Sequence, residues 1–306
     1  MKKFMLDLQV SGVERIHERY VLLRLTCVER LPEMVPGQFA EVRVDGSPST
    51  FLRRPISIHF VDRRNNELWL LVATVGDGTR RLGQLQVGER VNCVLPLGNG
   101  FSIPPRENRG ARTADERGEH ETDERGERAA DERGAQEAAG GARAADKGGA
   151  QAGCAEAKLL LVGGGVGVAP LLFLGAELKG LGFEPTFLLG ARTGGDLLMV
   201  DEFRRYGRVL ITTEDGSVGE RGFVTRHSVL STESFDRIYT CGPTPMMKAV
   251  AAYAYKNNVF CEASLENMMA CGLGACLCCV EKTTEGNLCV CKNGPVFNIN
   301  QLLWQN

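Results

Sequence analysis

The sequence predicts a multidomain protein of the β plus α/β class, in which an antiparallel β-barrel is followed by an open parallel α/β sheet and a small C-terminal unit. Three observations predict this class. Short β-rich runs fill residues 1–103, strands alternate with helices over 158–259, and closely spaced cysteines mark 260–306. A chain of 306 residues with 43% hydrophobic content has room for two or more such cores.

Composition excludes some classes of function. The formal net charge of −2 gives no electrostatic reason to expect nucleic acid as a partner. Eleven cysteines could indicate a secreted disulfide framework. The start of the sequence, Met1 to Asp7, meets charged residues too early for the apolar region of a signal peptide, so we expect a reducing, cytoplasmic location.

Residues 1–103 are predicted to form the barrel. Their β-rich runs are separated by proline and glycine turns and include 20–26, 39–44, 68–75 and 90–95. Many strands at such short spacing are typical of a barrel or a sandwich.

The next segment, 104–157, differs abruptly in composition. It contains no Val, Ile, Leu, Met, Phe, Trp or Tyr, and the sequence Asp-Glu-Arg-Gly recurs in it at 115, 123 and 131. Such a segment cannot bury apolar surface to offset its ordering entropy, so we expect a disordered low-complexity insertion. The alternatives are a transient helix with Glu and Arg pairs four residues apart, and an interaction tether.

Residues 158–259 are predicted to form an α/β domain. The expected strands are 159–162, 186–189, 209–212 and 237–240, and 170–179 is the expected first helix. This alternation is typical of an open sheet with crossover helices. The uncharged stretch 159–176 is long enough for a membrane span, but its many glycines divide it into a strand, a loop and a helix, so we expect no membrane association.

A glycine turn follows the first of these strands. Its residues are Gly163, Gly164, Gly165 and Gly167, and the next helix opens on Pro170. Proline suits the first helical turn because its missing N–H has no intrahelical partner to lose. Exposed amides and the helix dipole favour a pyrophosphate there, although Pro170 replaces the third glycine of GxGxxG. Close packing of strand against helix is the alternative explanation.

The second motif is Cys241-Gly242-Pro243, directly after the predicted strand 237–240. Ligands of open α/β sheets bind beyond the carboxyl ends of strands, where this turn would lie. A simple buried cysteine is the alternative. Two such turns in one domain favour a dinucleotide.

The third motif, Arg53-Arg54-Pro55-Ile56-Ser57, lies in the β-rich part. Adjacent arginines can pair with a phosphate, while strand amides and Ser57 can bind a flat heterocycle. An edge strand with solvated arginines is the alternative. Gly78 and Thr79 belong to the turn 75–81, whose amides could meet a second phosphate oxygen.

Near the end of the chain, Cys271, Cys276, Cys279 and Cys291 have the plant-type spacing for a [2Fe-2S] cluster. Gly272 and Gly274 supply backbone freedom where side chains would crowd the inorganic sulfides. The loop therefore predicts one-electron chemistry.

Two other cysteines leave alternatives open. Cys278 adjoins a predicted ligand, and in a β-like segment Cys289 would share the face of Cys291. The fourth ligand is thus less well defined than the first three. Zinc on Cys276, Cys279, Cys289 and Cys291 is an alternative, as are ordinary buried thiols.

Taken in order, these motifs resemble the ferredoxin-NADP reductase superfamily, in which a flavin-binding β-barrel precedes a nicotinamide-binding α/β domain. The segments 263–276 and 290–297, the second containing Gly-Pro-Val-Phe, narrow the resemblance. They look like those of the electron-transfer subunits of dihydroorotate dehydrogenase B. The resemblance covers nearly everything except 104–157.

The resemblance implies three cofactors: FAD, a [2Fe-2S] cluster and NAD. It places FAD at Arg54, Pro55, Ile56, Ser57, Gly78 and Thr79, with Leu71, Val72 and Ala73 as weaker assignments. Many superfamily members have tyrosine where this chain has Ile56, so stacking on the flavin is not expected from that position. It also implies that Cys241 is a positioning group near the nicotinamide and flavin rings.

The resemblance further implies a role in pyrimidine biosynthesis. An FMN-containing partner subunit would oxidise dihydroorotate, and electrons would pass through this chain's cluster and FAD to NAD+. The implied assembly is a heterotetramer with two copies of each chain.

The sequence is compatible with three other functions. One is a subunit of an NADPH-ferredoxin transhydrogenase or sulfide dehydrogenase. The others are a non-enzymatic iron–sulfur redox sensor and a zinc-stapled nucleotide-binding module. Choice of nicotinamide cofactor is weakly encoded, because Arg192 and Arg204 could each meet a 2′-phosphate but no motif fixes them there.

Overall fold

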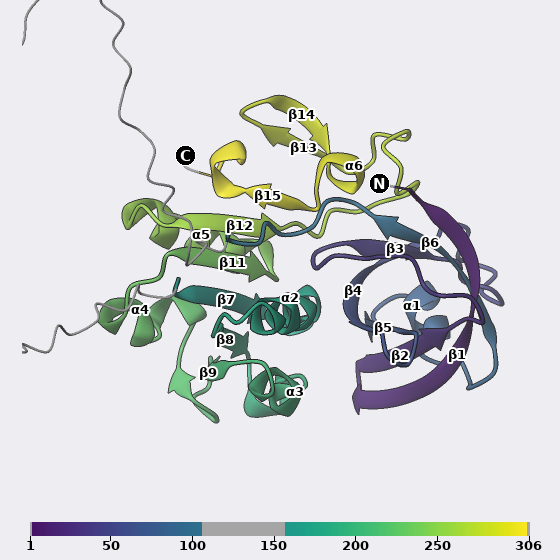
Figure 1. Ribbon diagram of the computed structural model, residues 1–306, viewed down its shortest axis with the longest axis horizontal. Coiled ribbons are helices and arrows are strands. Elements are labelled where there is room, and N and C mark those ends of the chain that lie inside the picture. The colour runs from purple at the N-terminus through teal and green to yellow at the C-terminus, as the bar shows by residue number, and fades with distance from the viewer. Residues whose placement is uncertain (1, 106–156, 305–306) are drawn as a thin grey trace, which may run out of the picture. The chain divides into compact units, whose positions relative to one another are not determined.

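The computed structural model describes residues 2–105 and 157–304 (Figure 1). The insertion expected at 104–157 falls almost wholly outside the described residues. The fold class expected from the sequence is confirmed, because a closed barrel, a mainly parallel sheet and a cysteine-rich C-terminal unit follow in that order.

Six antiparallel strands close the barrel in the order β1-β2-β5-β4-β3-β6. The strands are β1 (Phe4–His17), β2 (Tyr20–Thr26), β3 (Phe39–Val42), β4 (Arg54–Asp62), β5 (Glu67–Ala73) and β6 (Arg90–Leu97). Inward-facing aliphatic side chains such as Leu8, Val21 and Leu70 fill its interior. The short helix α1 (Asp77–Leu82) follows β5, so the expected turn 75–81 is largely helical.

The second sheet has seven strands in the order β10-β9-β8-β7-β11-β12-β15. Its strands are β7 (Leu159–Gly164), β8 (Thr186–Ala191), β9 (Arg208–Thr213), β10 (Glu220–Arg221), β11 (Arg237–Cys241), β12 (Phe260–Ser264) and β15 (Val296–Asn298). All pair in parallel except β15, which is antiparallel to β12. The parallel strands therefore end at one edge, where both predicted nucleotide motifs lie.

Helices connect these strands. They are α2 (Ala169–Gly180), α3 (Val200–Arg204), α4 (Val229–Thr232) and α5 (Thr244–Lys256), with single 3-10 turns at Gly165–Val168, Gly194–Asp196 and Val224–Arg226. Pro170 lies in the first turn of α2, as predicted. No helix among the described residues is long and apolar enough to cross a membrane.

The cysteine-rich segment leaves the sheet after β12 and returns to it as β15. Between them lie the hairpin β13 (Val280–Thr283) and β14 (Gly286–Cys289) and the single helical turn α6 (Val290–Asn293). The expectation of a β-like segment joining Cys289 to Cys291 is wrong, because Cys291 belongs to α6. The two side chains therefore do not share one face as they would on a strand.

Helix α2 joins the barrel to the sheet, since it contacts both β4 and β7. His59 of β4 lies 2.8 Å from the carbonyl oxygen of Ala169 through its Nδ1 atom and is completely buried. Because a carbonyl only accepts, Nδ1 must carry the proton. Arg63 forms an ion pair of 2.6 Å with Glu177 on the same helix. The helix that begins at the glycine turn is thus fixed to the predicted flavin strand.

Candidate functional site

The two nucleotide motifs meet backbone to backbone. A Cβ atom on Gly167 would lie 2.3 Å from Cα of Gly242, and one on Gly164 would lie 2.7 Å from Sδ of Met246. Only glycine permits an approach this close. Gly165, with φ +57°, adopts a conformation that favours glycine and has open space at its Cβ position. Glycine here serves both close packing, at Gly164 and Gly167, and a left-handed backbone conformation, at Gly165.

A cavity of about 560 Å³ opens at this edge, a volume within the range of small-molecule sites. Gly164, Gly165 and Pro243 line it, together with Tyr20 of the barrel. Arg192 also lines it. Arg204 does not, and its guanidinium pairs with Asp201 at 2.7 Å. Of the two arginines considered for a 2′-phosphate, only Arg192 faces the cavity.

Cys241 ends β11 and is almost completely buried. Its thiol donates to Oε1 of Glu266 across 3.8 Å, and in register it lies opposite Ser264 of β12. Burial is the main cause that raises the pKa of Cys241, so the thiol is protonated. Glu266 is exposed, but surrounding protein raises its carboxyl pKa by desolvation. Sequence reasoning missed Glu266, whose only signal was its place two residues beyond a strand end.

The predicted flavin residues lie on β4 and α1 and come together in space. A Cβ on Gly78 would be 2.9 Å from Nε of Arg54, so the arginine passes directly over this glycine. Thr79 Oγ1 accepts a hydrogen bond of 3.0 Å from the Gly76 amide and fixes the start of α1. Leu71 and Val72 are buried in β5, which leaves only their backbone for a ligand, and Ala73 is half-buried.

The adjacent arginines of this motif differ in their contacts. Arg53 donates to the carbonyl oxygen of Asn92 at 3.0 Å and also to the Asn92 side chain, which ties it to β6. Within the part of the chain that the structure describes, Arg54 makes only a long contact of 3.4 Å to the Arg53 carbonyl oxygen. Arg54 is therefore the arginine left to pair with an anionic ligand.

Backbone amides of the cysteine loop point at sulfur atoms. Cys271 Sγ accepts from the amides of Leu273 and Ala275 at 3.3 and 3.4 Å. Cys291 Sγ accepts from Gly274 at 3.1 Å. The Leu273 amide is the main cause that lowers the pKa of Cys271 to about 6. Amides arranged in this way stabilise thiolates, the form that binds metal.

The predicted ligands form two neighbouring pairs, Cys271 with Cys276 and Cys279 with Cys291. As they stand, no group of three or more His, Cys, Asp or Glu side chains within 2–105 and 157–304 could hold a metal ion. Two thiolate pairs with amides donating to their sulfurs nevertheless fit a two-iron cluster, which takes four thiolates. The assignment of these four ligands stays a prediction.

The two remaining cysteines of this region lie differently. Cys278 is exposed, whereas Cys289 is half-buried with its Sγ 3.9 Å from the carbonyl oxygen of Gly274. Cys289 is thus close enough to the loop to remain the alternative fourth ligand.

The cysteine loop also packs on the barrel, beside the predicted flavin strand. A Cβ on Gly272, with φ +64°, would lie 2.6 Å from Cγ of Glu41 on β3, and Glu41 pairs in register with Pro55. Glu41 is buried, neither of its carboxylate oxygens has a hydrogen-bond partner in the described residues, and burial raises its pKa to about 7. No sequence pattern pointed to this residue.

The Gly-Pro-Val-Phe segment explains how the loop is held there. The Asn99 amide and side chain donate to the carbonyl oxygens of Gly294 and Asn293, and the Leu265 amide donates to that of Pro295 at 2.9 Å. This segment therefore attaches the cysteine-rich unit to the end of β6 and to the residue that follows β12.

Two family models match the chain. The iron-sulfur cluster binding domain of dihydroorotate dehydrogenase B matches residues 266–303, and the oxidoreductase NAD-binding domain matches 161–252. These matches cover the cysteine loop and the glycine turn.

Curated relatives and solved structures extend the comparison to the whole chain. Dihydroorotate dehydrogenase B (NAD(+)) electron transfer subunits from Shouchella clausii and Bacillus velezensis are 36% and 33% identical, covering 88% and 99% of this chain and 86% and 99% of theirs. A structure of an NADH-dependent reduced ferredoxin-NADP oxidoreductase, studied for flavin-based electron bifurcation, superposes with TM-score 0.72 at 26% identity, covering 97% of this chain and 90% of that one. The ferredoxin reductase of carbazole 1,9a-dioxygenase shares the fold, with TM-score 0.58 at 15% identity over 85% of this chain and 67% of that one.

The barrel, the glycine-lined cavity and the cysteine loop together define an iron–sulfur flavin oxidoreductase of the ferredoxin-NADP reductase type. The two curated relatives, at 36% and 33% identity over 88% and 99% of this chain, then show its family. The chain belongs to the dihydroorotate dehydrogenase B electron transfer subunits. The resemblance expected from its motifs is thereby confirmed.

Proposed function

We propose that this chain passes electrons from the FMN of a dihydroorotate-oxidising partner to NAD+, with a [2Fe-2S] cluster and FAD as its own cofactors. The observation that supports this proposal most directly is that the cysteine loop and the dinucleotide cavity both adjoin the barrel that bears the flavin motif. When bound, FAD exchanges single electrons with the cluster and electron pairs with NAD+. The chain's own residues position these groups.

On the barrel, Arg54 and the first turn of α1 would hold the FAD phosphates. Arg53 is occupied by Asn92, so its guanidinium stabilises the strand instead of binding the ligand. The backbone amides of Ile56 and Ser57 are proposed to face the flavin ring, and Gly78 leaves room for the Arg54 side chain that would pair with the phosphate.

On the sheet, the amides of the glycine turn would bind the pyrophosphate of NAD(H). Cys241 is proposed to contact the nicotinamide as a neutral thiol, because its raised pKa keeps the proton on sulfur. Its near-complete burial shields the thiol itself from water. Glu266 accepts from that thiol and so orients it.

Around the cysteine loop, apolar side chains are exposed. Met268, Leu273 and Leu277 are 84%, 47% and 63% exposed. Exposed apolar surface of this kind supports a docking site for the FMN-containing subunit. We propose Cys271, Cys276, Cys279 and Cys291 as the cluster ligands, a heterotetramer of two copies of each chain, and a cytoplasmic location.

The test uses the full chain reconstituted with iron, sulfide and FAD. We expect it to reduce artificial dyes with NADH but not to oxidise dihydroorotate, and we expect a copurifying subunit that contains FMN. Appreciable dihydroorotate oxidation by this chain alone would refute the division of labour. Absorbance from flavin alone, with no iron bound, would favour the zinc alternative.

A second candidate is a subunit of an NADPH-ferredoxin transhydrogenase. It is favoured by the likeness to the reduced ferredoxin-NADP oxidoreductase structure, which covers 97% of this chain. Copurification separates the two, because that partner would carry additional iron–sulfur clusters and no FMN. A redox sensor would bind a partner without oxidising NADH.

A further inference from the structure

One face of β3 lies against the cysteine loop. Along this strand Ala40 and Val42 belong to the core of the barrel, so Phe39 and Glu41 point to the other side. Phe39 packs in the same apolar cluster as the predicted ligand Cys291. Of the two β3 side chains that meet the loop, Glu41 is therefore the polar one.

The carboxyl group of Glu41 faces the turn beside Cys271. A Cβ on Gly272 would lie 2.6 Å from Cγ and 2.9 Å from Oε1 of Glu41. Gly272 has φ +64° and directly follows Cys271 in the chain. Gly272 thus leaves the space that the carboxyl group occupies, one residue from a predicted cluster ligand.

This carboxyl group has no partner within the protein. Glu41 is 1% exposed, and neither of its carboxyl oxygens has a hydrogen-bond partner in residues 2–105 and 157–304. Arg53 lies nearby, but it donates to the carbonyl oxygens of Glu41 and Asn92, at 3.3 and 3.0 Å. A buried polar group without a partner is costly, so this side chain indicates a ligand.

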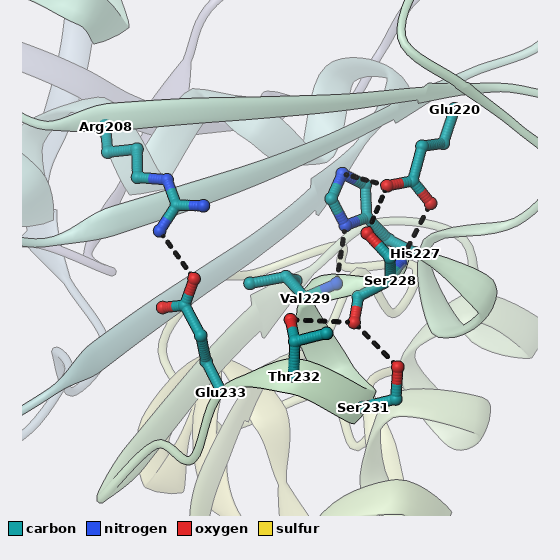
Figure 2. A network of polar contacts seen from close by, with 8 residues as sticks. All are labelled: Arg208, Glu220, His227, Ser228, Val229, Ser231, Thr232 and Glu233. Atoms are coloured by element: carbon teal, nitrogen blue, oxygen red, sulfur yellow. Dashed lines mark hydrogen bonds and ion pairs between the residues drawn. The ribbon is translucent and has the colours of Figure 1, made fainter.

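Glu220 on β10 shows a carboxylate whose two oxygens are both satisfied (Figure 2). One oxygen accepts from the Ser228 amide at 2.8 Å, and the other accepts from the Ser228 hydroxyl and lies 3.4 Å from Nε2 of His227. Strand β10 is at one edge of the seven-stranded sheet, whereas β15, which follows the cysteine loop, is at the other. Glu220 is therefore a matched control for Glu41.

The surroundings of Glu41 favour the neutral acid. An ionised carboxylate that is buried without a donor or a paired cation is strongly disfavoured. Burial is the main cause that raises the pKa of Glu41 to about 7, in agreement with this argument. The neutral acid has an O–H to donate, and the sulfur atoms of the loop already accept from backbone amides.

We infer that Glu41 is a positioning residue of the electron relay, whose protonated carboxyl group donates a hydrogen bond to a sulfur of the cluster and raises its reduction potential. The inference rests on the proposed function, since it requires a [2Fe-2S] cluster on the cysteine loop. Hydrogen bonds to the sulfurs of a cluster favour its reduced form, because they offset the charge of the added electron.

The position of Glu41 relates this effect to the route of the electrons. Glu41 pairs in register with Pro55, which belongs to the predicted flavin motif on β4. The donor is thus on the side of the cysteine loop that faces the flavin strand. Unlike the backbone amides that donate to Cys271 and Cys291, this donor can be removed by substitution.

The test is the midpoint potential of the cluster in the reconstituted full chain at pH 6, followed by electron paramagnetic resonance and visible absorbance. Glu41→Met keeps an unbranched side chain but has no donor, and we expect its potential to fall by about 60 mV, which is about tenfold for one electron. Glu41→Gln keeps an N–H donor and should stay close to the wild type. Glu220→Gln should have the wild-type potential.

The two Glu41 variants also test the charge of the group. If Glu41 were ionised, both substitutions would remove a negative charge and would raise the potential above that of the wild type. If the carboxyl group did not reach the cluster, both variants would keep the wild-type potential. Either result would overturn the inference.

Urea unfolding of the iron-free full chain distinguishes this role from a structural one. Methionine buries no unpartnered oxygen, so we expect Glu41→Met to unfold at a higher urea concentration than the wild type. A lower potential in the loaded variant would then not come from a weakened fold. A lower unfolding midpoint would show that the carboxyl group stabilises the fold itself, and would overturn its assignment.

The outcomes separate this inference from the proposed function. If the reconstituted wild type contains the cluster but the potentials do not follow the expected order, only the role of Glu41 is wrong. If it contains neither iron nor the spectrum of a cluster, the proposed function fails and the role of Glu41 fails with it.

Discussion

The dinucleotide cavity and the cysteine loop bind their groups by different means. The cavity is shaped by backbone: Gly167 packs on Gly242, and Gly165 lines the cavity with open space at its Cβ position. The loop depends on side chains, since its amides converge on the sulfurs of Cys271 and Cys291. A dinucleotide would bind the first site noncovalently, whereas a metal cluster would be bound in the second site by cysteine thiolates.

This difference predicts how each region responds to substitution. A substitution in the cavity should displace the binding groups slightly and lower the affinity for NADH, or the rate of reaction with it, in part. A change of a cluster ligand should act through coordination and remove the cofactor outright. The four tests below run from the largest expected effect to the smallest.

Substitution of a cluster ligand should have an almost all-or-none effect on cluster binding. We expect Cys291→Ser to lose the cluster and to abolish transfer from dihydroorotate to NAD+ in the complex, because serine is a poor substitute for thiolate on iron. NADH-dependent dye reduction through FAD should remain. Iron quantification and the visible spectrum measure the first effect.

Cys278→Ser is the matched control for this test, because Cys278 is exposed and lies beside a predicted ligand. It should keep the cluster. If Cys278→Ser or Cys289→Ser lost the cluster while Cys291→Ser retained it, the proposed ligand set would be wrong.

Crowding the glycine contact should weaken the cavity without touching the loop. In Gly167→Ala the new Cβ would lie 2.3 Å from backbone of Gly242, so the two turns must move apart. We expect kcat/KM for NADH to fall by about a hundredfold, as for other small displacements of a binding group. Flavin and iron content should not change.

Gly180→Ala serves as the control, because nothing lies within 4 Å of the Cβ position there. It should have wild-type kinetics. A wild-type KM for NADH in Gly167→Ala would show that this backbone contact does not shape the site.

Acid should weaken the attachment of the dinucleotide helix to the barrel. Burial lowers the pKa of His59 from 6.5 to about 4, so the unfolded chain takes up its proton first and stability falls as pH drops below 6.5. By pH 5 the loss from this one group should reach about 2 kcal/mol.

The measurement is urea unfolding between pH 7.5 and 5 for the wild type and His59→Asn. Asparagine can still donate to Ala169 but does not titrate, so its curve should be flatter in this range. The raised pKa of Glu41 acts in the opposite direction and is present in both proteins, so the difference isolates His59. Identical slopes would contradict the burial argument.

The smallest effect is expected at Glu266. Glu266→Ala leaves the buried Cys241 thiol without its acceptor, and we expect flavin reduction by NADH to slow about fivefold. Glu266→Gln keeps an acceptor oxygen and should stay nearer to the wild type. Rapid-mixing measurements of flavin absorbance distinguish the two variants. Equal rates for both variants would show that Glu266 does not contribute to the site.

Local pattern was enough to predict the elements that carry the motifs. The run 20–26 coincides with β2, and the glycine turn with Pro170 spans the end of β7 and the start of α2. These features depend on hydrophobic runs and on turn chemistry, which neighbouring residues determine. The fold class followed from them.

Contacts between distant segments could not be predicted in this way. Arg53 and Arg54 are neighbours of the same type, and only pairing with β6 decides that Arg53 is engaged by the barrel. Glu41 and Glu266 are single carboxylates without a pattern, and their roles arise from which loops meet them. The helical turn α6 was missed because two nearby cysteines suggested a strand.

The most direct test measures NADH formation from dihydroorotate and NAD+ with three samples: this chain alone, the FMN-containing partner alone, and their complex. We predict NADH formation only in the complex, and none in a complex built with Cys291→Ser. NADH formation by this chain alone, or an unchanged rate in the Cys291→Ser complex, would contradict a relay that passes through this chain's cluster.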